Sequence, residues 1–139
     1  MTKTARRESP VSVPEKSGRQ WLLQSVSRKY GFCPVDTWTP SVNLYQLDNR
    51  VEVCFDLAGV DPKSIDVQIE QGKLTVTGHR LTPEPSRKAD ETIRIVAMEI
   101  DHGQFCRVIA LPDLVDIRKA DSEYKAGLLW VRIPLKLRK

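Results

Sequence analysis

The sequence predicts an all-β fold, an antiparallel β-sandwich, preceded by an N-terminal arm that is disordered and partly helical. From about residue 41, apolar and polar residues alternate with a period of two, as in the run from Val51 to Asp56. Such alternation is typical of half-buried strands in an antiparallel sheet. Turn residues interrupt the pattern at short intervals, and almost no helical periodicity follows residue 41. Seven or eight short, closely spaced strands therefore favour a sandwich.

The predicted strands follow one another in chain order. Alternating residues and β-forming runs place them at about 42–46, 51–56, 64–70, 74–77, 92–98, 104–110, 115–119 and 128–135. Turns are expected at Asp48-Asn49, between Gly59 and Pro62, and at Gln71-Gly72, where Gly72 can supply the positive φ of a tight hairpin. Between Gly78 and Gly103 the chain first forms a charged, proline-containing loop and then the apolar run 92–98, which has no adjacent hairpin partner.

Three zones are predicted along the chain. Residues 1–37 form the arm, 38–136 the folded domain, and 137–139 an end without a long extension. Residues 1–18 are polar and predicted to be disordered. Residues 19–30 place apolar side chains at helical spacing, and Gly31 is suited to end such a helix. This short amphipathic helix would need to bury its apolar side to be stable.

Composition limits the classes of function. The chain of 139 residues is 40% hydrophobic, enough for one core, and it has no apolar run of the roughly 18–20 residues that a membrane span needs. Three cysteines without a CxxC pair favour a reducing, cytoplasmic location, with Cys54 and Cys106 as small buried residues. The start has no apolar segment typical of a secretory signal.

The net charge of +4 is concentrated in the arm. Residues 1–31 contain seven basic and two acidic residues (+5), and the remainder has 15 basic and 16 acidic residues (−1). A basic arm could contact nucleic acid or anionic lipid, but the domain has no basic patch interleaved with aromatic residues. We therefore expect a solvated arm, with neither nucleic acid nor a membrane surface as a partner.

No constellation of catalytic residues is recognisable. His79 and His102 are the two histidines, and the chain lacks a P-loop, a GxGxxG motif, a Gly-x-Ser-x-Gly elbow and HExxH. His102 lies four residues before Cys106, yet a structural zinc site usually takes four ligands. We expect no enzymatic activity, no cofactor and no metal site.

Several ordered motifs resemble the α-crystallin domain of the small heat-shock proteins, in the branch found in bacteria and plants. Each is weak alone, but together they cover residues 38–135. They are Trp38–Tyr45, Phe55–Val60, Gly72–Gly78, Glu99–Pro112 with its Leu111-Pro112 pair, and the series Ala120, Gly127 and Leu129. The resemblance implies an immunoglobulin-like sandwich and an ATP-independent holdase that binds unfolded client proteins. Refolding would then fall to ATP-driven chaperones. Ala126 departs from the asparagine common before this glycine.

The resemblance also implies a strand-swapped homodimer. In the bacterial and plant branch, the strand corresponding to 92–98 pairs with the first strand of a neighbouring subunit, here 42–46. The expected interface residues are Val42, Leu44, Ile93, Ile95 and Arg107. Arg107 would pair with Glu99, Asp101 or a carboxylate of the second subunit. The alternatives are that 92–98 closes its own sheet and that Arg107 lies exposed on an outer sheet face.

Client binding is expected at two apolar surfaces. One is the arm segment Trp21, Leu22, Leu23 and Val26. The other is a groove between the strands at 64–70 and 115–120, lined by Ile65, Val67, Ile69, Val115 and Ile117. Because the chain ends soon after the domain, without the Ile-x-Ile tail usual in the family, we expect a dimer or a small oligomer. Val11 and Val13 have the same i, i+2 spacing and are candidates to dock in the groove, unless the segment is only a disordered leader.

Two other classes stay open. A β-sandwich module similar to the CS-domain cochaperones would bind one specific partner rather than unfolded clients. A structural or membrane-surface protein would use the basic amphipathic arm. Suppression of aggregation for two unrelated clients, together with liposome flotation, separates these classes from a holdase.

Overall fold

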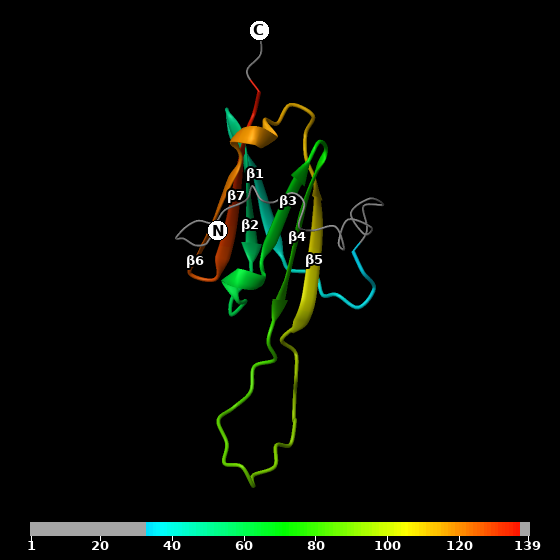
Figure 1. The fold of residues 1–139 in the computed structure, drawn as a ribbon, viewed down its shortest axis with the longest axis vertical. Coiled ribbons are helices and arrows are strands. Elements are labelled where there is room, and N and C mark those ends of the chain that lie inside the picture. Colours follow the sequence, from blue (N-terminus) through cyan, green and yellow to red (C-terminus); the bar gives the residue numbers. More distant parts are fainter. Residues whose placement is uncertain (1–32, 137–139) are drawn as a thin grey trace.

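The computed structural model describes residues 33–136, and within that range the chain forms a two-layer antiparallel β-sandwich (Figure 1). The four-stranded sheet has the order β1-β2-β7-β6 and the three-stranded sheet the order β3-β4-β5. The strands are β1 (Val42–Gln46), β2 (Arg50–Asp56), β3 (Asp66–Glu70), β4 (Lys73–Arg80), β5 (Gly103–Ala110), β6 (Asp121–Lys125) and β7 (Leu128–Pro134). Two short 3₁₀ helices, η2 (Pro62–Ser64) and η3 (Ile117–Lys119), connect them. The predicted all-β sandwich is confirmed.

The alternation in the sequence determines which side chains fill the space between the sheets. In β2, Val51, Val53 and Phe55 are buried, and they lie opposite Ile133, Val131 and Leu129 of β7. The other sheet contributes Leu74, Val76, Phe105 and Ile109 from β4 and β5. These apolar residues occupy alternate positions of their strands and therefore all point inward. The two sheets thus share one continuous core.

A two-residue turn joins β6 to β7. Ala126 has a φ of 55° and Gly127 a φ of 80°, so both central residues are left-handed, as in a type I′ turn. Gly127 is also packed closely, because a Cβ there would lie 3.1 Å from Cα of Ala58. Its carbonyl accepts a hydrogen bond from the amide of Leu57 at 2.9 Å. Ala126 therefore holds a conformation that its side chain disfavours.

The predicted strand at 115–119 is wrong. Residues Ile117–Lys119 form η3, and the carboxylate of Asp116 accepts a hydrogen bond from the amide of Arg118, which starts the helix. Val115 makes only an isolated bridge to Leu135. The strand that pairs with β7 at one edge of the four-stranded sheet is instead β6, which the sequence did not reveal. Ala120, at the end of η3, packs against the core.

The run at 92–98 is also not a strand in the described chain. It lies in the long loop 81–102, which extends away from the sandwich between β4 and β5 (Figure 1). The three-stranded sheet contains no strand from this loop, so the alternative in which 92–98 closes its own sheet is wrong. A strand needs a neighbour for its backbone hydrogen bonds, and no strand of the described residues lies beside the run 92–98.

Candidate interaction surfaces

The loop 81–102 presents apolar side chains to solvent. Every residue from 83 to 102 is exposed, and the exposed fractions of Ile95, Val96 and Met98 are 63%, 86% and 52%. Ile93 and Ile100 are exposed as well. A monomeric protein seldom leaves so many large apolar residues together in water, so this run is a candidate contact surface.

Strand β1 is a second candidate contact surface. It pairs with β2 on one side, and among residues 33–136 no strand pairs with its other side. Leu44 is 53% exposed, and Val42 is partly buried against the core. An open edge of this kind offers unpaired amide and carbonyl groups to another strand.

Arg107 lies close to the same edge. Its neighbours two residues away, Phe105 and Ile109, are buried in the core, so its side chain leaves β5 on the inner side of the sheet. The guanidinium is partly buried and Nη1 donates a hydrogen bond of 3.0 Å to the carbonyl of Pro40, two residues before β1. The contact places Arg107 beside the start of β1. A carboxylate partner for Arg107 stays a prediction.

Arg80, the last residue of β4, links the start of the loop 81–102 to its end, a role that the sequence did not indicate. Its guanidinium lies 4.2 Å from the centre of the Trp38 ring, within cation–π range. It donates to the carbonyl of Asp101 (2.8 Å from Nε) at the far end of the loop and to that of Ala58 (2.9 Å from Nη1). These partners are far apart in sequence, so no local pattern could have revealed the cluster.

Strand β3 forms the open edge of the three-stranded sheet. Val67 and Ile69 face Val76 and Leu74 of β4, and with Ile65 they are partly buried at the margin of the core. Ile117 packs there from η3. Val115 is fully buried, which corrects its placement on an accessible surface. The second strand expected to line the groove, at 115–120, is replaced by η3. The edge strand of the other sheet is β6, whose Ser122 and Tyr124 lie opposite the buried Val131 and Leu129.

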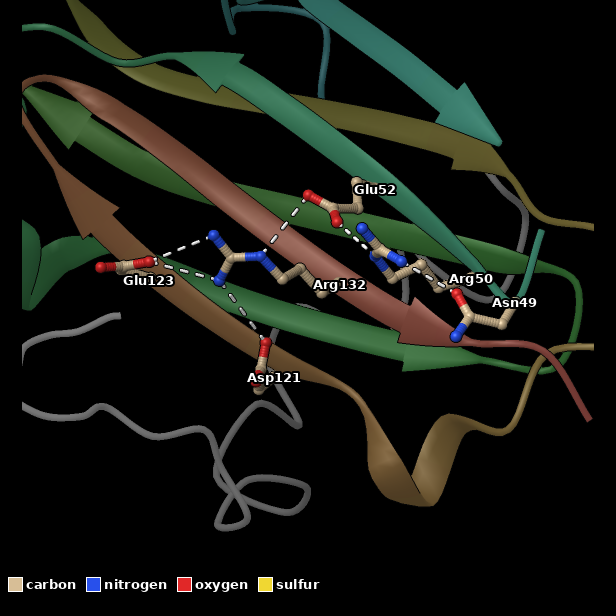
Figure 2. Close-up of polar contacts among 6 residues, drawn as sticks. All are labelled: Asn49, Arg50, Glu52, Asp121, Glu123 and Arg132. Atoms are coloured by element: carbon tan, nitrogen blue, oxygen red, sulfur yellow. Dashed lines mark hydrogen bonds and ion pairs between the residues drawn. The ribbon is translucent and has the colours of Figure 1, made fainter. Parts of the chain in front are cut away.

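A network of charged residues lies on the outer face of the four-stranded sheet (Figure 2). Glu52, only 14% exposed, accepts a hydrogen bond from Arg50 and forms an ion pair with Arg132 at 3.5 Å. Arg132 also contacts Glu123 at 3.2 Å and Asp121 at 3.9 Å. Figure 2 shows this chain of charges crossing β2, β7 and β6. Beside these charges, the rings of Tyr45 and Trp130 stack with their centroids 6.1 Å apart, so the outer face combines an ion-pair network with an aromatic pair.

Comparison with known proteins identifies the family. The profile of the Hsp20/alpha crystallin family matches residues 44–139. The chain belongs to this family. The 18 kDa heat shock protein of Streptomyces albus G is 40% identical over 83 residues, covering 60% of this chain and 55% of that protein. The 18 kDa antigen 1 of Mycobacterium avium is 33% identical over 102 residues, covering 73% of this chain and 60% of the antigen.

Solved structures share the same fold. The hspA structure from Xanthomonas axonopodis is 34% identical with a TM-score of 0.59, and the match covers 71% of this chain and 95% of that one. A small heat-shock protein from Xylella fastidiosa is 29% identical with a TM-score of 0.61, covering 74% and 91%. The sandwich of residues 33–136 is thus an α-crystallin domain.

The cysteines of this α-crystallin domain differ from expectation. Cys33 and Cys106 form a disulfide, with their Cα atoms 5.6 Å apart. The prediction of three reduced cysteines is therefore wrong. The sequence could not show that Trp38 pairs with Phe105 and so brings Cys33 near β5. Cys54 is free and buried, as predicted, and its burial and the nearby Asp56 raise the pKa of its thiol.

Other expectations depend on parts of the chain beyond the described range. The arm residues Trp21, Leu22, Leu23 and Val26, the helix at 19–30, and Val11 and Val13 lie outside the described residues. Between residues 33 and 136, histidines, cysteines and carboxylates form no cluster able to hold a metal ion. No helix in that range is long and apolar enough to cross a membrane.

Proposed function

We propose that this protein is an ATP-independent holdase chaperone that binds exposed apolar segments of unfolding proteins and prevents their aggregation. The observation that carries the proposal is the open edge of β3, where Ile65, Val67 and Ile69 lie at the margin of the core, in a chain that belongs to the Hsp20/alpha crystallin family. A relative from Streptomyces albus G is named a heat shock protein. Holding an apolar segment requires accessible apolar surface and no chemical step. ATP-driven chaperones would then refold the released clients, and the expected location is the cytoplasm.

The assembly that we propose is a strand-swapped homodimer. Among residues 33–136, no strand pairs with the apolar run 92–98, and the outer edge of β1 is open. Pairing the loop of one copy with β1 of the other would supply backbone partners to both and cover Ile93, Ile95 and Leu44. Arg107, held beside Pro40, would lie at this interface with a carboxylate of either copy. The structure of the Xylella fastidiosa relative is described as having a distinct high-order structure, so larger assemblies are a further outcome to measure.

Clients would bind at the arm segment that contains Trp21, Leu22, Leu23 and Val26. The spacing of Trp21, Leu22 and Val26 in the sequence predicts a short amphipathic helix, which would be marginal in water and so would offer its apolar side to a client. The edge of β3, with Ile65, Val67 and Ile69, is the second candidate, and Val11 and Val13 would cover it when no client is bound.

The test is suppression of aggregation without ATP. Two unrelated proteins are heated with this chain, and light scattering measures their aggregation, with an equal mass of an inert protein as control. We expect scattering to fall for both clients. The triple variant Trp21→Ser, Leu22→Ser, Leu23→Ser should lose most of this activity, and a polar control in the same arm, Gln20→Ser with Gln24→Ser, should keep it.

Three outcomes would contradict parts of the proposal. Suppression of neither client, or of one alone, would favour a module with a specific partner. Recovery of the chain with liposomes in a flotation assay would favour a membrane-surface protein. Full activity in the triple variant would indicate that clients bind at the β3 edge rather than at the arm. Val67→Ser should then reduce the suppression of aggregation.

A further inference from the structure

The disulfide between Cys33 and Cys106 lies where the arm joins the domain. Cys106 belongs to β5 and is 2% exposed, while Cys33 is partly buried and is the first residue that the structure describes. Phe105, next to Cys106, points into the core, so Cys106 points to the outer face of the three-stranded sheet. The bond therefore attaches the end of the arm to that outer face.

Three further hydrogen bonds hold the segment 33–40 on β5. The amide of Trp38 donates to the carbonyl of Gln104 at 3.0 Å, and the carbonyl of Trp38 accepts from the amide of Cys106 at 3.1 Å. Arg107 then binds the carbonyl of Pro40. Between the disulfide and Trp38, a turn closes with a bond of 3.3 Å from the amide of Thr37 to the carbonyl of Pro34. Of these contacts, the disulfide is the one that a change of redox conditions can open.

We propose that Cys33 and Cys106 form a redox-controlled clamp that joins the arm to the α-crystallin domain. When the bond is closed, the arm leaves the domain at Cys33, over the outer face of β3-β4-β5. When it is open, residues 33–37 are released and Trp38 becomes the first attached residue. Cys33 precedes β1 (Val42–Gln46) in the chain, so the clamp would control the segment between the proposed client-binding arm and the proposed dimer edge.

The exchange requires a small disulfide such as oxidised glutathione. Cys33 is the more accessible thiol, so its thiolate attacks a glutathione sulfur and releases one glutathione thiolate, leaving a mixed disulfide. The thiolate of Cys106 then attacks the sulfur of Cys33, and the second glutathione leaves. Two electrons pass from the protein pair to the glutathione disulfide. Cys54 does not compete, because it is buried and its thiol is harder to ionise than an exposed one.

The first experiment follows the bond itself in the full chain. The protein is equilibrated in buffers of graded ratio of reduced to oxidised glutathione, blocked with an alkylating agent and digested with trypsin without reductant. Cleavage after Lys29, Arg50, Arg94 and Arg107 should give peptide 30–50 linked to peptide 95–107, and mass spectrometry measures its fraction. We expect the linked fraction to rise from near zero to near completion across the series. A pair that stays linked in the most reducing buffer, or is unlinked in the most oxidising one, overturns the clamp.

The second experiment measures what the clamp does. Reduction should lower the melting temperature by about 10 °C, because a disulfide that joins residues 73 positions apart restricts the unfolded chain. It should also increase hydrogen exchange at residues 34–38. Cys33→Ser should behave as the reduced protein in every buffer, and Cys54→Ser should keep the redox response. An equal melting temperature and equal exchange in both states would refute the clamp. Neither experiment uses a client, so their results are independent of the holdase proposal.

Discussion

The sandwich and the loop 81–102 contain similar apolar patterns with opposite outcomes. In β2, Val51, Val53 and Phe55 are buried between two sheets. In the loop, Ile93 and Ile95 alternate with polar residues in the same way, and both are exposed. The difference lies in the neighbouring strands, since β2 is flanked by β1 and β7, whereas no strand in the described part of the chain lies beside the loop. An alternating pattern therefore indicates a strand but does not say which chain supplies its partner.

Substitutions can separate the two regions. A change in the loop should affect association and leave the fold intact, whereas a change in the sandwich should affect the free energy of unfolding and leave the loop free to pair with a second copy.

The largest effect is expected from Ile95→Pro, because proline removes an amide that the swapped strand would donate. Two such strands form one dimer, so the dimer Kd should rise about 100-fold, a change of roughly 2.7 kcal/mol. Sedimentation across a dilution series measures it.

Ser86→Pro is the matched control for this prediction. It adds a proline to the same loop outside the run 92–98 and should leave the Kd unchanged. In Ile95→Pro, the circular dichroism of the sandwich should stay native. An unchanged Kd in Ile95→Pro would show that the loop does not mediate association.

Gly78→Ala tests the packing of the sandwich. An added Cβ at Gly78 would lie 2.5 Å from the Phe105 ring and 3.3 Å from the carbonyl of Ser64, so the core must shift. We expect a loss of about 2 kcal/mol in the free energy of unfolding, measured in urea. Phe105→Leu removes the clash, so the double variant should lose less than the sum of the two single losses. Additive losses would show that the ring does not press on residue 78.

Glu52→Gln tests the charge network of the outer face. Glu52 is more buried than its neighbours and contacts both Arg50 and Arg132, so the free energy of unfolding should fall by about 1 kcal/mol. Glu123→Gln is the control at the exposed margin and should change it by less than about 0.5 kcal/mol. Equal effects of the two substitutions would mean that burial of Glu52 does not strengthen its contacts.

Ala126→Asn tests the turn between β6 and β7. Asparagine tolerates a positive φ better than alanine, so this variant should gain about 0.5–1 kcal/mol in urea unfolding. Ala126→Val should lose stability, because a β-branched residue fits the left-handed region poorly. A gain with valine or a loss with asparagine would contradict the type I′ turn.

The smallest effect concerns pH and Tyr124. Its hydroxyl donates to the carbonyl of Leu57 at 2.7 Å, and burial raises the pKa of the phenol. The unfolded chain loses this proton near pH 10, before the folded chain does, so the contribution is complete below pH 10 and declines as the pH rises towards the folded pKa. Between pH 9 and 11 the wild type should therefore lose more stability than Tyr124→Phe. Parallel losses in the two proteins would mean that the phenol does not ionise differently on folding.

The strands with clear alternation could be predicted from the sequence. Strands β2, β3 and β4 follow their apolar residues within a few positions. Strand β6 could not be found, because its inward residues, Ser122 and Tyr124, do not form an apolar pattern. The alternation in 115–119 was misleading, since Asp116 caps a 3₁₀ turn there.

The candidate surfaces were predictable where one segment carries the signal. The apolar run 92–98 was recognisable because it stands between a charged loop and a strand. Arg80 and the Cys33–Cys106 pair were not, because each depends on the approach of residues that are distant in sequence. Those approaches follow from the backbone pairing of Trp38 with β5, which leaves no trace in the local pattern.

The pairing of 92–98 with β1 of a second copy is the central claim, and hydrogen exchange tests it most directly. Amide exchange of the full chain is followed by mass spectrometry at concentrations below and above the dimer Kd. We predict that peptides covering 92–98 and 42–46 become protected together as the concentration rises, while the core strand β4 stays protected throughout. Rapid exchange of 92–98 in a sample that sedimentation shows to be dimeric would contradict the claim.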